Sequence, residues 1–207
     1  MEVIVVANPK GGVGKSTLAT NIAGFYARQG EAVMLGDVDR QQSARDWLAL
    51  RPAGLPRILP WEIDGDGPAR PPKGTRRVVL DTPAGLHGKL RDKVLKVATQ
   101  VLVPLQPSLF DILATRHFLD ALREEKAVRK GDLAVGVVAM RVDARTRAAG
   151  QLDRFLADYG LPVVTHLRDT QLYVQLAARG FTLFDLGGAS VGRDLEQWQP
   201  LSDWLRR

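Results

Sequence analysis

The sequence predicts an α/β protein built on a doubly wound, mostly parallel sheet. Apolar β-branched runs alternate with helical patterns along almost the whole chain, an order typical of βαβ units. A chain of 207 residues can bury one substantial core but is short for two. We therefore expect a single domain over residues 1–207, beginning with a strand at residues 3–6.

The later elements follow from the same two periodicities, about 3.6 residues for helices and 2 for strands. Trp47, Leu48 and Leu50 are the expected apolar anchors of the second helix. Strands are expected at residues 32–36, 58–59, 77–80, 101–105, 134–140 and 161–166. Helices are expected at residues 18–28, 42–50, 146–159, 172–178 and 193–206, and a long helix is expected to run through residues 114–122.

The segment 51–75 is rich in proline and glycine and gives the weakest structural signal. We expect it to be a surface excursion, with a turn and loop over residues 64–68. Trp61 within it is expected to fill the core rather than to contact a partner.

Composition excludes several classes of protein. The chain has no cysteine, which rules out a disulfide scaffold, a thiolate-bound zinc and a cysteine-ligated iron–sulfur cluster. No apolar run reaches the length of a membrane span, and no signal-peptide pattern opens the chain. We therefore expect a cytoplasmic protein.

The positive charge is concentrated in one stretch. The formal net charge is +6, and residues 70–96 hold eight Lys or Arg against Asp81 and Asp92. Such an excess suggests an anionic partner, either nucleic acid or lipid headgroups, although a solvated surface is the plainer alternative.

The most informative stretch is the glycine-rich loop at residues 7–17, which reads Ala-Asn-Pro-Lys-Gly-Gly-Val-Gly-Lys-Ser-Thr. A strand followed by this loop and a helix is the context of a phosphate-binding P-loop. Glycine lets the backbone wrap an anion, and the helix adds the positive end of its dipole. Lys15 can reach the β- and γ-phosphates, and Ser16 can ligate Mg²⁺. The expected nucleotide contacts are Lys10, Gly11, Gly12, Val13, Gly14, Lys15, Ser16 and Thr17.

Asp81 is the expected partner of this loop. It ends the apolar strand Val78-Val79-Leu80, and a carboxylate at the end of a buried strand beside a P-loop holds Mg²⁺. An apolar strand that ends in Asp is a weak signal alone, but it becomes strong beside the loop.

Lys10 sets this loop apart from an ordinary P-loop. Pro9 replaces the usual first glycine, and Lys10 adds a second lysine at the loop's start. The stretch Asn8-Pro9-Lys10-Gly11-Gly12 resembles the deviant Walker A family of ParA and MinD ATPases, most of all its small ParF-type members. The resemblance implies that Lys10 reaches across an ATP-bound homodimer to the partner's nucleotide, so that Lys10, Lys15 and Asp39 are the catalytic residues.

The resemblance also assigns Asp37-Val38-Asp39 to the family's switch I motif. It implies that Asp37 lies in the outer coordination sphere of the metal and that Asp39 orients the attacking water. Arg40 replaces the proline that the family normally has next, and Ala84 replaces the second of two prolines after Asp81. We expect Arg40 to affect the rate of hydrolysis more than its existence, and Ala84 to alter the stiffness of its loop without removing its function.

Arginines supply the remaining expected contacts. Arg141 follows an apolar strand, at a position from which a side chain could cover the adenine ring, although an ordinary surface arginine is the alternative. Arg145 and Arg168 resemble DNA-contacting arginines of chromosomal ParA proteins, and they could instead pair with nearby Asp143, Asp153 or Asp169. Contacts of this kind bind DNA without sequence preference.

The resemblance therefore implies a nucleoid-associated ATPase that uses ATP and Mg²⁺, dimerises on ATP and binds DNA non-specifically. A ParB-like or other adaptor would stimulate its hydrolysis and connect it to a plasmid, chromosome or other cargo. One alternative is a MinD-like regulator at the membrane. The acidic residues of the terminal helix disfavour it, and we expect that helix to pack on the domain. A metabolic P-loop ligase, similar to dethiobiotin synthetase, is the other alternative, and Lys10 argues against it.

Overall fold

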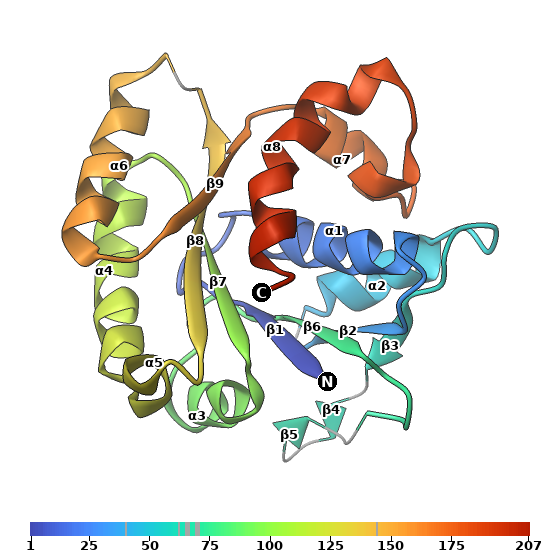
Figure 1. The fold of residues 1–207 in the computed structure, drawn as a ribbon, viewed down its shortest axis with the longest axis horizontal. Helices are drawn as coiled ribbons and strands as arrows, with labels where there is room; N and C mark the ends of the chain where they lie inside the picture. The colour runs from blue at the N-terminus through green and yellow to red at the C-terminus, as the bar shows by residue number, and fades with distance from the viewer. Residues whose placement is uncertain (40, 62, 65–66, 69–70, 144) are drawn as a thin grey trace.

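A computed structural model describes residues 1–39, 41–61, 63–64, 67–68, 71–143 and 145–207. Its centre is a seven-stranded, all-parallel sheet between two layers of helices (Figure 1). Across the sheet the strands are β3 (Leu59–Trp61), β2 (Val33–Asp37), β6 (Arg77–Asp81), β1 (Glu2–Val6), β7 (Gln100–Leu105), β8 (Ala134–Val142) and β9 (Val163–Arg168). The predicted fold class is confirmed.

The helices divide between the two faces of the sheet (Figure 1). One face carries α1 (Lys15–Arg28), α2 (Ser43–Leu50), α7 (Leu172–Ala177) and α8 (Gly192–Trp204), with short 3₁₀ turns at Leu183–Asp185 and Ala189–Val191. The other face carries α3 (Gly88–Val97), α4 (Leu109–Glu124), α5 (Lys126–Lys130) and α6 (Arg147–Tyr159).

The side-chain alternation of the strands explains why both layers form. In β1, Ile4 and Val6 belong to the core on the α1 side, whereas Val3 and Val5 belong to the core on the α4 side. Successive residues of a strand point to opposite faces, so a strand that is apolar at every position needs helices on both faces.

The strand order gathers the carboxyl ends of the central strands at one crevice. From β1 the chain runs outward to β2 and β3 and returns to β6, and it then crosses to β7 on the other side of β1. Such a reversal leaves an open crevice at the carboxyl edge of the sheet. The registers place Val6 beside Asp81, and Asp81 beside Asp37. The loops that follow β1, β2 and β6 therefore meet at one place.

Three local expectations need correction. Residues 64–68 are predicted as turn and loop, but β4 (Ile63–Asp64) and β5 (Gly67–Pro68) pair as antiparallel strands, while residues 65–66 lie outside the described part. Leu50 is 57% exposed rather than an anchor, because it stands at the very end of α2. Helices α3 and α5 are not predicted, since charged residues leave them only short apolar stripes.

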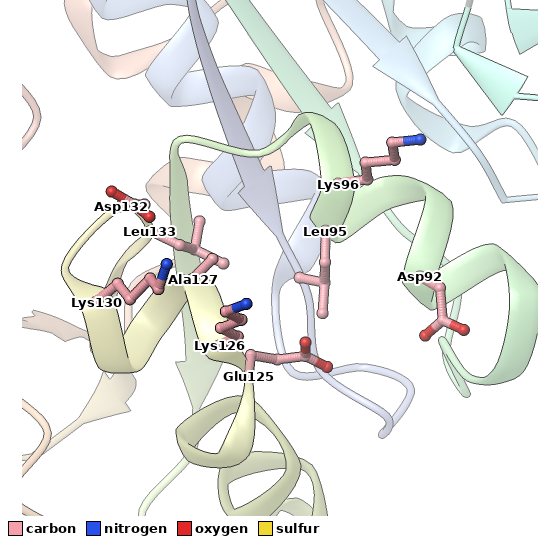
Figure 2. Close-up of a pocket in the computed structure, with 9 residues that line it drawn as sticks. All are labelled: Asp92, Leu95, Lys96, Glu125, Lys126, Ala127, Lys130, Asp132 and Leu133. Atoms are coloured by element: carbon pink, nitrogen blue, oxygen red, sulfur yellow. The ribbon is translucent and has the colours of Figure 1, made fainter.

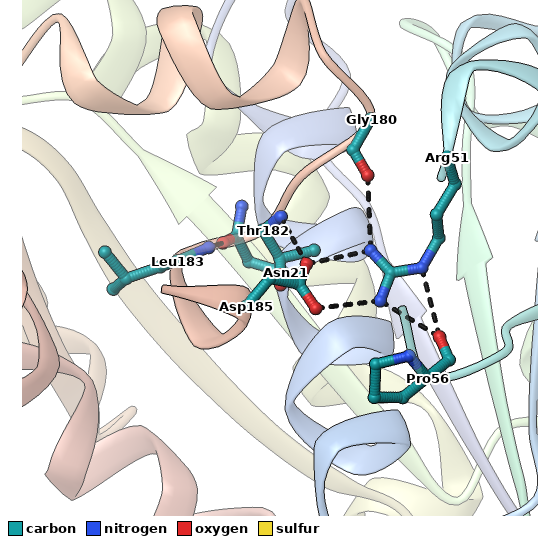
Figure 3. Close-up of polar contacts among 7 residues, drawn as sticks. All are labelled: Asn21, Arg51, Pro56, Gly180, Thr182, Leu183 and Asp185. Atoms are coloured by element: carbon teal, nitrogen blue, oxygen red, sulfur yellow. Dashed lines mark hydrogen bonds and ion pairs between the residues drawn. The ribbon is translucent and has the colours of Figure 1, made fainter. Parts of the chain in front are cut away.

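The segment after α2 is tied to the C-terminal part of the chain by Arg51. Its guanidinium donates two hydrogen bonds to the Asp185 carboxylate, at 2.8 and 2.9 Å, and others to the carbonyls of Pro56 and Gly180 (Figure 3). Asp185 also accepts hydrogen bonds from the backbone and hydroxyl of Thr182, both at 2.7 Å. Both side chains of the ion pair are buried.

Helix α8 packs on the domain, as expected. Trp198, Leu201 and Leu205 in and after this helix are at most 1% exposed, and the Tyr26 hydroxyl on α1 donates to the carbonyl of Leu205 at 3.0 Å. Its apolar face is therefore occupied by the core. Among the described residues, none of the helices has the length and apolarity needed to cross a bilayer.

Candidate nucleotide site

The loop between β1 and α1 has a backbone that requires glycine at two positions. Gly12 and Gly14 have φ angles of 74° and 98°, in the left-handed region that side chains disfavour. A Cβ on Gly14 would also lie 2.8 Å from Cε of Met140 on β8. The loop is thus shaped by backbone conformation and by close contact with a neighbouring strand.

Asn8 holds the start of this loop from within the core. Its side chain is fully buried, and its amide donates to the Pro104 carbonyl at 2.8 Å and to the Thr115 hydroxyl at 3.0 Å. Its carbonyl oxygen accepts the backbone N–H of Lys10 at 2.8 Å. Asn8 therefore connects the loop to β7 and α4, a role that the loop motif alone does not predict.

Lys15 lies inside the loop, with its ammonium group held 2.8 Å from the carbonyl oxygen of Lys10. The residue is only 8% exposed. Burial lowers the pKa of Lys15, while the carboxylates of Asp81 and Asp39 oppose that shift. A cation held close to two carboxylates is well placed to receive an anionic group at this loop.

Asp81 is the most perturbed acid of the site. Burial raises the pKa of Asp81 to about 7, and the neighbouring Asp37 and Asp39 carboxylates add to the rise, whereas hydrogen bonding to Ser16 and the charge of Lys15 oppose it. Its Oδ1 is buried without a hydrogen-bond partner. A buried, unpaired carboxylate oxygen beside a hydroxyl fits a hard divalent cation. The described residues contain no cluster of three or more His, Cys, Asp or Glu that could hold a metal, so such a cation would depend on phosphate oxygens and water.

The two switch I carboxylates have different surroundings. Asp37 accepts the backbone N–H of Asp39 at 2.9 Å and that of Ala44 at 2.8 Å, and burial raises its pKa despite these bonds. Both of its oxygens therefore stabilise the turn into α2. Asp39 accepts the backbone N–H of Gln41 and also faces the loop. Arg40, which is expected to affect the rate of hydrolysis, lies outside the described residues.

The loop and the switch segment enclose an open cavity of about 330 Å³. Six of the expected loop residues and Asp39 line it, whereas Lys10 and the buried Val13 do not. Sequence reasoning missed Thr82, which is buried and donates its hydroxyl to the Val6 carbonyl at 2.9 Å. The lining residues are Gly11, Gly12, Gly14, Lys15, Ser16, Thr17, Asp39, Gln41, Ser43, Thr82, Ala84 and Arg141.

Arg141 connects this cavity to a second one. It lies where the pairing of β8 with β9 is irregular, with a left-handed φ of 53°. A non-glycine residue in this conformation stores strain, and such residues cluster at functional sites. Its exposed side chain also lines a hollow of about 220 Å³ beside Gly14 and Thr17, which Asp169 and Tyr173 help to form. Arg141 thus lies between the cavity at the loop and the smaller hollow beside Gly14 and Thr17.

Lys10 points away from its own phosphate cavity. It is not among the residues that line that cavity, and its ammonium group instead pairs with Asp111 on α4 at 2.8 Å. Asp111 is buried, whereas the Lys10 side chain remains 37% exposed. The two lysines of the loop therefore have separate environments.

The two arginines expected at DNA are paired within the chain. Arg145 is 90% exposed and bonded to Asp143. The guanidinium of Arg168 makes two hydrogen bonds, at 2.8 and 2.9 Å, to Asp194, which is fully buried. Arg168 also lines the smaller hollow beside the loop. Their part in DNA binding remains a prediction.

A family model described as the CobQ/CobB/MinD/ParA nucleotide binding domain matches residues 4–183. The chain belongs to this family. The match runs from β1 into the first 3₁₀ turn, so it includes the glycine-rich loop, both switch I carboxylates, Asp81 and Arg141. The predicted resemblance to ParA and MinD proteins is confirmed.

Relatives of this chain within the family include proteins that distribute carboxysomes and partition chromosomes. The maintenance of carboxysome distribution protein A of Gloeobacter kilaueensis is 29% identical over 99% of this chain and 94% of its own length. The chromosome-partitioning ATPase Soj of Thermus thermophilus is 31% identical over 72% of this chain and 73% of its own. The structure of a Cyanothece McdA variant in complex with ATP shares the fold, with a TM-score of 0.72 at 16% identity, over 98% of this chain and 96% of that one.

Proposed function

We propose that this protein is an ATPase that acts as a nucleotide-controlled dimer switch and positions a cargo inside the cell on a DNA surface. Its ATP would lie in the cavity at the glycine-rich loop, with the base beside Arg141. The relatives named as a chromosome-partitioning ATPase and a carboxysome distribution protein support a positioning role. The dimer, the DNA and the adaptor are parts of our proposal.

The observation that carries this proposal is the orientation of Lys10. A lysine that leaves its own phosphate cavity to Lys15 is available to a nucleotide bound by another subunit. Three exposed apolar residues follow on α4, with Leu109 65%, Phe110 77% and Leu113 50% exposed. These side chains flank Asp111, the partner of Lys10. A dimer that covers them would bury apolar area at the place where Lys10 crosses.

The bound nucleotide would be held and cleaved by residues with separate tasks. Lys15 and the loop N–H groups would neutralise the phosphates, and Ser16 and Asp81 would hold Mg²⁺, which offsets the negative charge on the phosphate oxygens. Asp39, which faces the cavity, would accept a hydrogen bond from the attacking water and so orient it. Asp37 would act through the turn that it stabilises.

Hydrolysis would release the dimer from DNA. Two subunits that close around ATP double the number of cations on one surface, and affinity for DNA rises steeply with the number of phosphates contacted. Loss of the γ-phosphate removes the group that Lys10 would bind across the interface. An adaptor bound to the cargo, ParB-like in its role, would stimulate this step, and the protein would be found at the nucleoid.

The direct test is the molar mass of wild type and of Lys10→Ala by light scattering, with and without ATP and Mg²⁺. We expect wild type to double its mass with ATP and Lys10→Ala to remain monomeric while still binding nucleotide. Lys73→Ala serves as the control, because Lys73 is also an exposed lysine but lies far along the chain, outside the loop. A wild-type chain that stays monomeric at saturating ATP would refute the proposal.

A further inference from the structure

A groove between α3 and α5 lies at the edge of the sheet opposite the nucleotide site. It is an open hollow of about 410 Å³ (Figure 2). Its floor includes Leu95, Ala127 and Leu133, and lysines from both helices stand around it. Helix α3 ends just before β7 begins and α5 just before β8 begins, so both ends lie at the amino edge. A strand of five or six residues separates the two edges by about 17–20 Å.

Cations outnumber acids along these two segments. Residues 89–96 and 125–132 hold seven Lys or Arg against three Asp or Glu. Two of the acids, Asp92 and Glu125, lie 3.1 and 3.5 Å from the guanidinium of Arg91. The third, Asp132, lies at the end of the groove beyond Lys130. Arg91 thus engages two of the three carboxylates, and the two segments together carry a net charge of +4 (7 − 3).

The lysines that line the groove have no such partner. Lys96, Lys126 and Lys130 are exposed, and no hydrogen bond or ion pair engages their ammonium groups within the described part of the chain. Arg129 on α5 is likewise exposed and unpaired there. Arg145 and Arg168, by contrast, are each bonded to a carboxylate. Lys96, Lys126, Arg129 and Lys130 thus form a group of unpaired cations at the amino edge.

We propose that the α3–α5 groove, with Lys96, Lys126, Arg129 and Lys130, is a second DNA-binding surface that contacts the phosphate backbone without sequence preference. Unpaired lysines on two neighbouring helices suit a polyanion whose charges repeat along a strand, because each phosphate contact releases bound counterions. The inference rests on the proposed function only in its choice of DNA as the polyanion.

The groove lies apart from the nucleotide site, so DNA binding there should not depend on nucleotide. One subunit supplies the whole groove, and its residues are remote from the loop that binds nucleotide. Binding there therefore requires neither ATP nor a dimer, so the release on hydrolysis proposed above concerns the DNA contacts that only the dimer makes. A dimer closed through the carboxyl edges would carry one such groove on each subunit, so it would hold DNA at two further places.

The test measures anisotropy of a fluorescent random-sequence DNA duplex over a range of salt concentrations, with wild type and a Lys126→Glu/Lys130→Glu variant, in the absence of nucleotide. We expect wild type to bind weakly and with a marked salt dependence. The double variant should bind less well and should lower the slope of log affinity against log salt by about 2, one for each phosphate that is no longer neutralised. Both substitutions are at exposed positions, and circular dichroism with thermal melting checks the fold.

A Lys73→Glu/Arg193→Glu variant is the matched control, since it makes the same change in net charge at exposed positions of the described chain that do not line the groove. It should leave the slope close to that of wild type. Equal losses of DNA affinity in the two variants would overturn the inference, and so would a wild type that binds no DNA without nucleotide. Binding of polyglutamate in preference to the duplex would also overturn it, because it would assign the groove to an acidic protein. Light scattering with ATP on the same variants tests the dimer switch separately, because the inference can fail while the dimer still forms.

Discussion

Replacing Arg51 with methionine should destabilise the whole domain. Methionine keeps much of the apolar stem of arginine but removes the guanidinium. The change would leave Asp185, whose side chain is fully buried, without its ion-pair partner. It would also remove the hydrogen bond to the Pro56 carbonyl, within the segment after α2, and the one to the Gly180 carbonyl, which joins that segment to the one before the first 3₁₀ turn.

The size of the effect follows from the burial of the pair. Breaking a buried ion pair by removing one partner costs about 3–5 kcal/mol, because an uncompensated charge remains inside. Unfolding entropy of about 2.1 cal/mol/K per residue over 207 residues converts this loss into a drop in melting temperature of about 7–12 °C. Removing both charges, in Arg51→Met/Asp185→Leu, should recover much of the loss.

Differential scanning calorimetry at several pH values is the assay, with Arg45→Met on the exposed side of α2 as the control. Burial alone would raise the pKa of Asp185, but the bonds from Arg51 and Thr182 outweigh it and lower that pKa. The ionised carboxylate therefore stabilises the fold at neutral pH, and this contribution fades as the pH falls below the ordinary Asp value of about 4. The gap between wild type and Arg51→Met should narrow in acid. A drop no larger than that of the control at pH 7 would refute this account.

Two further predictions concern the loop. Gly14→Ala should weaken nucleotide binding in titration calorimetry, because the φ of 98° disfavours any side chain and the Cε of Met140, 2.8 Å from the added Cβ, would have to move. Gly150→Ala in α6, where a Cβ meets no atom within 4 Å, should bind normally. Asp111→Asn removes the charge that pairs with the Lys10 ammonium. It should therefore lower the ATP concentration at which half of the protein is dimeric in light scattering. An unchanged concentration would show that the ion pair does not oppose dimerisation.

Local patterns were sufficient for the order of elements and for the loop. Alternating apolar runs and helical stripes reflect side-chain periodicity, which is a property of neighbouring residues. The glycines at positions 12 and 14 likewise express a backbone requirement of the loop itself. The same local signal was too weak for α3 and α5, where charged residues interrupt the apolar stripe.

Contacts between distant segments could not be predicted from local sequence patterns. The roles of Asn8 and of the Arg51–Asp185 pair depend on partners about 100 or more residues away in the chain. Arg168 bonds to Asp194 because α8 packs against β9. No periodicity encodes such partners, because they depend on how the elements pack.

The fold class, the phosphate-binding loop and the carboxylates at the ends of two strands could thus be predicted from local sequence, because each depends on consecutive residues. Packing of the elements directs Lys10 from its own cavity toward Asp111, and it sets Arg141 between two hollows. It also brings Lys96, Lys126 and Lys130 together at the opposite edge of the sheet. The physical reason is that the direction and the partners of a charged side chain depend on which elements surround it.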